Sequence, residues 1–369
     1  MKPIAVTFLV NGRFDGIEAV RANGLAKHLD PSTTRFLYRG HSRWVSAWKW
    51  IGALWGNHAQ VHYVLNTAMP GALLAVFWRF AFGVPYVLDT GDAIYAMARR
   101  SGTKAGWRLP LLWMLERVAE RFAATIVVRG TNHRDHLVLQ GRKRVVVIRD
   151  GCAEQSSATE DAVDTLRKSL GLGDRFVVGL MGSLVYSPRL QICYGWDLVE
   201  ALVDLKDLPV TGLVIGDGPG MKWLVQHATK LGVIDRLVFT GRIPYSAVPT
   251  YLRLMDVAIS TQTNNLPGQV RTTGKVPEYM AAERFILASK VGEAALLLPD
   301  IMLIDFNGEV DRSYPKRLAE RIRLLQSKPA LLEARYGTTA LAAQECNYSY
   351  LSSRLVWVIE EILKAKTPK

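Results

Sequence analysis

The sequence predicts an α/β protein of two successive domains, each with a parallel sheet covered by helices on both faces. Three observations predict this class. The chain has 369 residues, of which 49% are hydrophobic, enough for two cores of ordinary size. Short β-branched runs alternate with longer helical patterns, which is typical of parallel sheets. A polar stretch without apolar periodicity, residues 152–164, separates two such series.

Six β-branched runs predict the strands of an N-terminal domain, residues 1–155. The first run follows neither a long apolar stretch nor a small-residue cleavage site, so we interpret it as a strand rather than a signal peptide. This favours a cytoplasmic protein. The runs lie at residues 4–10, 34–38, 61–65, 84–89, 125–128 and 145–151.

The most apolar segment is GALLAVFWRFAFGVPYVL, which begins at Gly71. A membrane-spanning helix needs about 20 mainly apolar residues. Here Arg79 stands in the middle and a Gly-Val-Pro break follows, so we interpret the segment as a buried helix followed by a buried strand. No segment is predicted to cross a bilayer.

A second series of runs predicts the strands of a C-terminal domain, residues 165–345. Beyond it, apolar residues recur at helical spacing from Leu351 to Ile362, which predicts an amphipathic helix in a final segment, residues 346–369. The strand candidates of this series lie at residues 176–182, 210–220, 236–241, 257–260 and 284–289.

Histidine and cysteine usage gives no sign of a metal site. His133 and His136 lie three residues apart around Asp135, but no further zinc ligand can be nominated, so we interpret them as ordinary polar residues. The cysteines are odd in number and widely spaced, which suits small buried residues in a reducing compartment: Cys152, Cys193 and Cys346.

The net charge of +13 is carried almost wholly by the first half of the chain. Residues 1–150 contain 21 Lys and Arg against 9 Asp and Glu, or +12, whereas the remainder contains 25 against 24, or +1. Such asymmetry indicates an anionic partner for this half. Because no nucleic-acid module is present, we expect no nucleic-acid binding.

Tryptophans are concentrated in the same half, where seven of the ten fall within the first 113 residues. Trp44, Trp48 and Trp55 are spaced to share one face of a helix, with Arg43 and Lys49 close by. An amphipathic helix of this kind can lie flat on an anionic membrane. The alternative is that these tryptophans build the core of the domain or wall an acceptor groove.

The stretch GKVPEYMAAERFILAS, residues 274–289, predicts a short helix followed by a strand. Pro277 suits the first turn of a helix, since its missing amide hydrogen would be unpaired there. Lys275, with Arg271 four residues earlier, then lies beside the positive end of the helix, where charge and amides would hold a pyrophosphate. Glu278 could accept two hydroxyl hydrogens from a ribose. The alternative is an ordinary surface ion pair.

A second candidate site is VTGLVIGDGPG, where a strand ends in Gly216, Gly218 and Gly220 before a helix that starts near Met221. Glycines at such a turn let backbone amides approach an anionic ligand closely. A plain structural turn is the alternative.

An ordered series of motifs runs from Phe176 to Tyr350: VGLMGSLVY, GWDLVEAL, LVIGDGPGMKWL, LGVIDRLVFTGRIPYSAVPTYLRLMDVAIS, RTTGKVPEYMAAERFILAS and LAERIRLLQSKPALLEARYGTTALAAQECNYSY. In order and spacing it resembles the C-terminal domain of family 4 retaining glycosyltransferases. The first half resembles their N-terminal domain more faintly, through NGRFDGIEAVRANGLAKHL, VPYVLDTGDAIY and TIVVRGTNHRDHL. The resemblance implies the GT-B architecture: two Rossmann-like domains facing across a cleft, with a C-terminal helix crossing back to the N-domain.

The resemblance also implies that a nucleotide-diphosphate sugar binds mainly to the C-terminal domain and an acceptor mainly to the N-terminal one. Glu278 matches the glutamate that holds the ribose, and Lys275 and Arg271 fall beside the diphosphate. The other donor contacts that it implies are Gly12 and Gly16 at the phosphates, Arg242 near the base, and Gly216 and Gly218 on the floor between the domains.

Three departures from the family pattern concern the expected site. Val270 stands where a glutamate often contacts the donor sugar, so Asn264 or Asn265 is expected to contact it. Ser183 and Tyr194 in MGSLVYSPRLQICYGW stand where the family often has basic residues, which leaves Arg189 as a substitute. The residue before Asp92 is a glycine where the family frequently has a histidine, so the acceptor-side polar group is expected to be Asp92 or Asp89.

The sequence contains no DxD pair to bridge a diphosphate through a metal, so we expect no metal and no cofactor besides the donor. The resemblance alone implies a retaining hexosyltransferase. With no evident carboxylate nucleophile, we expect front-face attack with Asp92 orienting the acceptor hydroxyl. Its expected acceptor is a lipid-linked or otherwise anionic glycan in polysaccharide biosynthesis, at the inner face of the cell membrane. The rivals are a non-catalytic nucleotide-sugar-binding partner of another transferase and a sugar-nucleotide isomerase.

Overall fold

The computed structural model describes residues 3–56, 58–100, 106, 108–152 and 159–365. These residues form two compact units, each with its own six-stranded sheet. The first unit comprises the described residues up to Gly151, the stretch Val270–Thr272 and the described residues from Glu345 onward. The second comprises the described residues of Cys152–Gln269 and Thr273–Gln344.

The sheet of the first unit is parallel throughout, with the strand order β2-β1-β3-β4-β5-β6. Strands β1, β3, β4 and β5 are buried along their whole length, which explains their nearly continuous hydrophobic runs. The six strands are β1 (Val6–Val10), β2 (Thr34–Tyr38), β3 (Val61–Leu65), β4 (Tyr86–Thr90), β5 (Thr125–Val128) and β6 (Val145–Val147).

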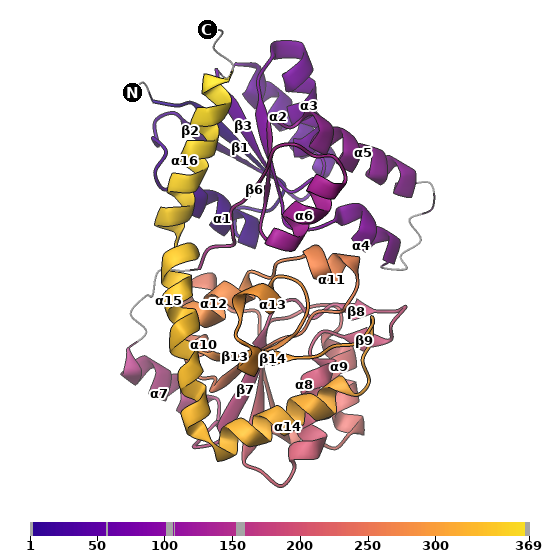
Figure 1. Cartoon of the computed structure of the whole chain (residues 1–369), viewed down its shortest axis with the longest axis vertical. Helices are drawn as coiled ribbons and strands as arrows, with labels where there is room; N and C mark the ends of the chain where they lie inside the picture. The colour runs from indigo at the N-terminus through magenta and orange to yellow at the C-terminus, as the bar shows by residue number, and fades with distance from the viewer. Residues whose placement is uncertain (1–2, 57, 101–105, 107, 153–158, 366–369) are drawn as a thin grey trace. The chain divides into compact units, whose positions relative to one another are not determined.

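Two groups of helices cover the two faces of this sheet (Figure 1). Successive strand residues point to opposite faces, so Phe8 packs with α1 and α16 whereas Leu9 packs with α2, α3 and α5. The helices of the first unit are α1 (Ile17–Leu25), α2 (Arg43–Trp55), α3 (Gly71–Phe82), α4 (Ile94–Arg100), α5 (Arg108–Phe122), α6 (Thr131–Leu139) and α16 (Tyr348–Lys364).

The amphipathic helix predicted near the C-terminus is α16, and its packing on the first unit confirms the prediction. Its apolar residues from Leu351 to Ile362 are buried against α1 and the sheet, and each such side chain contributes about 1.5–3 kcal/mol. Two glycines allow this contact, because a Cβ on Gly24 or Gly151 would lie 2.3 or 2.5 Å from the ring of Tyr348. The helix begins where Asn347 accepts a hydrogen bond from the amide of Tyr350.

The interpretation of residues 71–82 as a buried helix is wrong for one face of α3. Ala72, Ala75 and Trp78 are buried in the core, but three of its phenylalanines are half exposed or more. An apolar sequence cannot by itself tell which face of a helix meets the core. Across the described ranges, every helix is too short or too polar to cross a bilayer.

Helix α2 also turns large apolar side chains outward. Trp44, Trp48 and Trp55 are 73, 74 and 71% exposed, whereas Trp50 and Leu54 reach the core. The alternative that the three tryptophans build the core is therefore wrong. They form one exposed face, as their spacing predicts.

The second unit repeats the parallel arrangement, in the order β11-β10-β7-β12-β13-β14. The sequence predicts five of these strands and misses β14 and the β8-β9 hairpin, whose strands of two residues show no periodicity. The strands are β7 (Phe176–Met181), β8 (Tyr186–Ser187), β9 (Ile192–Cys193), β10 (Val210–Ile215), β11 (Leu237–Gly241), β12 (Val257–Ser260), β13 (Phe285–Ser289) and β14 (Leu303–Ile304).

Helices flank this sheet, and the three cysteines of the chain are buried as expected. The helices of the second unit and of the segment leading to α16 are α7 (Glu160–Ser169), α8 (Trp196–Ala201), α9 (Met221–Lys230), α10 (Val248–Arg253), α11 (Leu266–Val270), α12 (Lys275–Ala281), α13 (Ala294–Leu297), α14 (Tyr314–Ser327) and α15 (Arg335–Glu345).

Candidate active site

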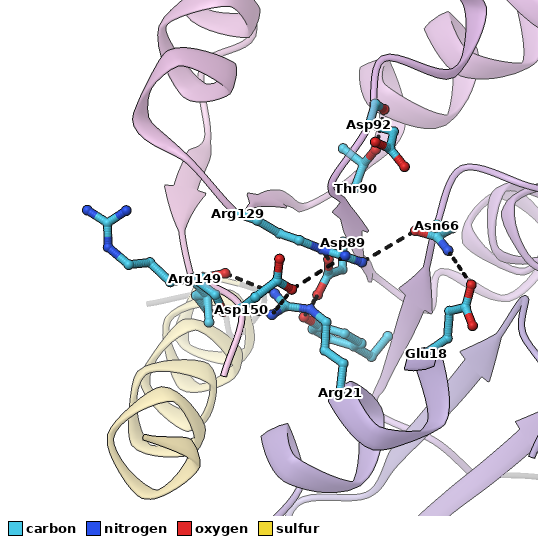
Figure 2. A network of polar contacts seen from close by, with 11 residues as sticks. Glu18, Arg21, Asn66, Asp89, Thr90, Asp92, Arg129, Arg149 and Asp150 are labelled. Atoms are coloured by element: carbon cyan, nitrogen blue, oxygen red, sulfur yellow. Dashed lines mark hydrogen bonds and ion pairs between the residues drawn. The ribbon is translucent and has the colours of Figure 1, made fainter. Parts of the chain in front are cut away.

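An ion-pair network lies at the carboxyl ends of the strands in the first unit (Figure 2). Asp89 in β4 is fully buried and accepts hydrogen bonds from Arg21 Nε at 2.8 Å and from Tyr63 Oη at 2.5 Å. Arg21 comes from α1 and also donates to two carbonyls just beyond β6, at 2.7 and 2.9 Å. Burial acts to lower the pKa of Arg21, but Asp89 and Asp150 raise it above its usual value, so the guanidinium stays charged.

Arg129 adds a second guanidinium to the network. It directly follows β5, and its Nε and Nη1 lie 3.5 Å from Asp89 and 3.4 Å from Asp150. Its side chain covers Gly91, since a Cβ there would lie 2.7 Å from Arg129 Nε. Position 91 must therefore be glycine while Arg129 keeps its place, and the guanidinium fills the space that a side chain there would need.

The network distinguishes the two candidate acceptor-side carboxylates. Asp89 is enclosed by Arg21, Arg129 and Tyr63, so its role is structural. The side chain of Asp92 is 33% exposed, and the hydroxyl of Thr90 fixes its loop by donating to the carbonyl of Asp92 at 3.0 Å. Only Asp92 of the two is open to a ligand, and it stays our prediction for the acceptor side.

A neutral histidine lies near Asp92. His133 in α6 is buried, and burial lowers its pKa to about 4, with His136 acting in the same direction and Asp92 against it. The imidazole is therefore uncharged near neutral pH. The spacing of His133 from His136 in the sequence did not indicate that it lies near Asp92.

A partly buried carboxyl holds the start of α4, the helix that follows Asp92. Glu116 in α5 accepts hydrogen bonds from the amides of Ile94 at 2.8 Å and Tyr95 at 3.3 Å. Burial, reinforced by Glu120, raises the pKa of Glu116 to about 7. A raised pKa means that the folded protein favours the protonated carboxyl, so its contribution to stability falls as the pH rises from 4.5 through about 7.

The variant Glu116→Gln is expected to remove this pH dependence, because a neutral amide can accept the same amide hydrogens at any pH. Wild type should lose stability as the pH rises and the variant should not. The difference between their free energies of unfolding should therefore grow by about 1–3 kcal/mol in favour of the variant between about pH 5 and pH 8. Urea unfolding across this range measures the difference. A difference that does not change with pH would contradict the assigned titration.

The loop after β1 carries the predicted pair Gly12 and Gly16. The carboxylate of Glu18 lies against both, since a Cβ would come within 2.5 Å of it at Gly12 and 3.1 Å at Gly16. Glu18 also accepts from Asn66 Nδ2 at 3.5 Å. The close approach that these glycines permit is thus to the chain's own Glu18, and their contact with donor phosphates stays a prediction.

In the second unit, Lys275 lies at the carboxyl end of β7. Its Nζ stands 3.8 Å from the ring centre of Tyr194 and would lie 3.1 Å from a Cβ on Gly182. A cation over an aromatic ring is stabilised by the ring's quadrupole, so Tyr194 positions the ammonium. In the sequence, Tyr194 stood out only as a position where the family often has a basic residue.

Glu278 lies one turn further along α12 and is buried. Its Oε1 accepts a hydrogen bond from the hydroxyl of Tyr245 at 2.5 Å, and Tyr245 itself is 38% exposed. Lys275 and Glu278 thus start from the same short helix, as predicted. The structure adds Tyr245, which no sequence motif indicated.

The glycine-rich turn between β10 and α9 packs against its own chain. The amides of Gly216 and Gly220 donate to the carbonyls of Gly241 and Leu184, at 3.0 and 2.8 Å, and that of Gly218 donates to the carboxylate preceding it. A Cβ on Gly216 would lie 2.1 Å from a carbonyl oxygen. The arrangement favours the structural-turn alternative, and donor contact at Gly216 and Gly218 stays a prediction.

The predicted sugar-side and base-side residues occupy loops of the second unit. Asn265 Nδ2 and Arg189 Nη2 both contact Glu309, at 3.1 and 2.5 Å, and Asn264 Nδ2 donates to a carbonyl at 3.2 Å. Arg242 is exposed just after β11. Glu309 therefore brings two of these residues together, while their contacts with a donor stay predictions.

Arg271 belongs to the short stretch that groups with the first unit, where its Nε lies 3.1 Å from Asp92 Oδ1. Two predicted catalytic residues thus meet. Both side chains are partly exposed, at 51 and 33%, so the pair adds little stability.

Residues 175–326 match the family described as "Glycosyl transferases group 1". The matched stretch contains all six strands of the sheet in the second unit.

Two curated relatives are similar to parts of this chain. A 2-deoxystreptamine glucosyltransferase of Streptomyces kanamyceticus is 28% identical over 277 residues, 70% of this chain and 66% of that protein. A GDP-mannose-dependent alpha-(1-6)-phosphatidylinositol monomannoside mannosyltransferase of Mycolicibacterium smegmatis is 39% identical over 100 residues, 26% of this chain and 25% of that protein. Both matches span less than two thirds of the relative's own length.

A solved structure is similar over nearly the whole chain. The Anabaena protein Alr3699/HepE, in complex with UDP and glucose, superposes with a TM-score of 0.76 at 17% identity, covering 97% of this chain and 99% of that one. This likeness concerns the fold. The chain therefore has the GT-B fold, and its residues 175–326 match the glycosyl transferases group 1 family.

Proposed function

We propose that the protein is a retaining, metal-independent hexosyltransferase that moves a sugar from a nucleotide-diphosphate donor to a lipid-linked or otherwise anionic glycan. The observation that carries the proposal is the pairing of Lys275 and Glu278 on α12, within a group 1 domain. The ammonium suits a diphosphate and the carboxylate suits the hydroxyls of a ribose. HepE, on the same fold, is described with UDP and glucose, which supports a nucleotide-sugar donor.

In the proposed reaction the acceptor oxygen attacks C1 of the sugar on the side from which the phosphate departs. The bond between C1 and the phosphate oxygen breaks, the new glycosidic bond forms, and the departing phosphate oxygen takes the acceptor's proton. Lys275 and Arg271 stabilise the charge that develops on the leaving group. Asp92 orients the acceptor hydroxyl, in a loop fixed by Thr90.

The proposed place of action is the inner face of the cell membrane. Support comes from the exposed tryptophan face of α2, flanked by Arg43 and Lys49, and from the excess of basic residues in the first half. The mycobacterial relative is named for a phosphatidylinositol monomannoside acceptor, which supports a lipid-linked one here.

The test is nucleotide release from a panel of UDP-, GDP-, dTDP- and ADP-sugars, with membrane lipid extract or soluble glycans as acceptor. We expect acceptor-dependent release from one donor, and none from the double variant Lys275→Ala, Glu278→Ala. Donor binding without release would instead support the non-catalytic partner, and donor conversion without acceptor would support the isomerase.

A further inference from the structure

A hollow of about 690 Å³ opens at the amino-terminal edge of the sheet in the first unit. Pro85 and Ala124, which immediately precede β4 and β5, form part of its wall. Arg79, Arg121 and Arg144 line it, from the last turns of α3 and α5 and from the residue before β6. Three guanidinium groups from separate elements therefore surround one space.

The charge of this hollow is uncompensated. No carboxylate is among its lining residues, and within the described part of the chain no hydrogen bond or ion pair engages the three guanidinium groups. Arg21 and Arg129 in the same unit, by contrast, are each paired with Asp89 and Asp150. Like charges held around one space repel one another, so an anion bound there would be stabilised.

Exposed aromatic residues border the hollow. Phe80 and Phe122 are among its lining residues, with ring centres 4.7 Å apart and exposed fractions of 64 and 39%. The aromatic surface continues along α3 to Phe77 and Phe82, and Phe82 meets Trp55 of α2 at 5.8 Å. An exposed patch of this kind marks a surface that meets an apolar partner.

We propose that this hollow binds the phosphate of an anionic phospholipid while the surrounding aromatic side chains enter the bilayer interface. A free phosphate ion would need the arginines but would leave the aromatic border unexplained. A bilayer surface satisfies both, because it presents phosphates beside apolar chains, and aromatic and basic side chains are favoured there. The occupant is thus a lipid headgroup.

This lipid site would specify how the protein associates with the membrane. It rests on the proposed membrane association, but it does not require that the protein transfers sugars. The hollow lies at the amino ends of the strands, whereas Asp89 and Arg129 lie at their carboxyl ends. Substitutions in the hollow therefore leave the candidate active site untouched, so lipid binding and catalysis can fail separately.

The test is cosedimentation of the full chain with vesicles of phosphatidylglycerol and phosphatidylcholine, against vesicles of phosphatidylcholine alone. The triple variant Arg79→Gln, Arg121→Gln, Arg144→Gln is expected to lose anionic-vesicle binding by about tenfold or more, since each basic residue near the surface contributes. The matched control removes the same charge from exposed positions of the second unit, as Lys168→Gln, Lys230→Gln, Lys316→Gln, and should bind like wild type.

A pair of aromatic substitutions distinguishes binding of a lipid headgroup in the hollow from binding of a free phosphate ion. Phe80→Gln, Phe122→Gln is expected to weaken vesicle binding while the arginines remain. Equal binding by wild type and the arginine variant overturns the proposal, as does equal loss in the lysine control. Displacement of vesicles by inorganic phosphate, but not by sodium chloride of equal ionic strength, would assign the hollow to free phosphate instead. Nucleotide release with a soluble acceptor, measured in parallel, reports separately on the proposed transferase.

Discussion

Replacing Lys275 by Ala is expected to lower kcat/KM for sugar transfer by about a hundredfold or more without unfolding the protein. A fixed donor that stabilises developing negative charge is typically worth about 10²–10³ in rate. The ammonium is held over the ring of Tyr194 and against the backbone of Gly182, so it is already in place before charge develops on the leaving phosphate.

The measurement is steady-state nucleotide release at saturating acceptor, with urea unfolding as the check on folding. Lys230→Ala, which removes an exposed lysine from the last turn of α9 in the same unit, is the matched control and should retain full activity. Lys275→Arg keeps the charge but changes its shape, and we expect it to recover only part of the rate. Wild-type rates in Lys275→Ala would remove this residue from the proposed mechanism.

The largest expected loss of stability follows from replacing Asp89 by Ala. This carboxylate is fully buried and is shared by Arg21, Arg129 and the hydroxyl of Tyr63. Its removal leaves the buried guanidinium of Arg21 and the partly buried one of Arg129 with Asp150 as their remaining shared carboxylate, and breaking a buried pair in this way costs about 3–5 kcal/mol.

Urea unfolding of Asp89→Ala and Asp92→Ala, three residues apart, provides an internal comparison. Asp92→Ala should change the free energy of unfolding by less than about 1 kcal/mol, because a partly exposed pair contributes little, yet it should impair transfer. Equal destabilisation by both substitutions would show that Asp92 is structural as well, and would leave the acceptor side without a carboxylate.

The sequence predicts the strands well because each central strand is a buried β-branched run, and it predicts α16 because its apolar spacing is strict. The exposed faces of α2 and α3 show what apolar spacing does not predict, namely which face of a helix is buried. Spacing places Trp44, Trp48 and Trp55 on one face, but it cannot say whether that face meets the core or solvent.

For the candidate site, the sequence indicates which side chains lie together only where they are close in the chain. Lys275 and Glu278 could be paired as candidates because one short helix carries both. The partners Tyr194 and Tyr245 lie far away in the sequence, and so do the members of the network around Asp89. Local patterns contain no information on such pairings, which depend on the order of the strands in each sheet.

The packing of α16 has a consequence for synthesis of the chain. The core of the first unit includes apolar residues of α16 from Leu351 to Ile362, whereas its other buried members all lie before Gly151. At about 5–20 residues per second, the ribosome needs roughly 10–40 s to make the intervening segment. During that interval the nascent first unit exposes the apolar surface that α16 later covers. The first unit can therefore complete its core only after α16 has been made, and a chain that ends before α16 is expected to leave this apolar surface exposed.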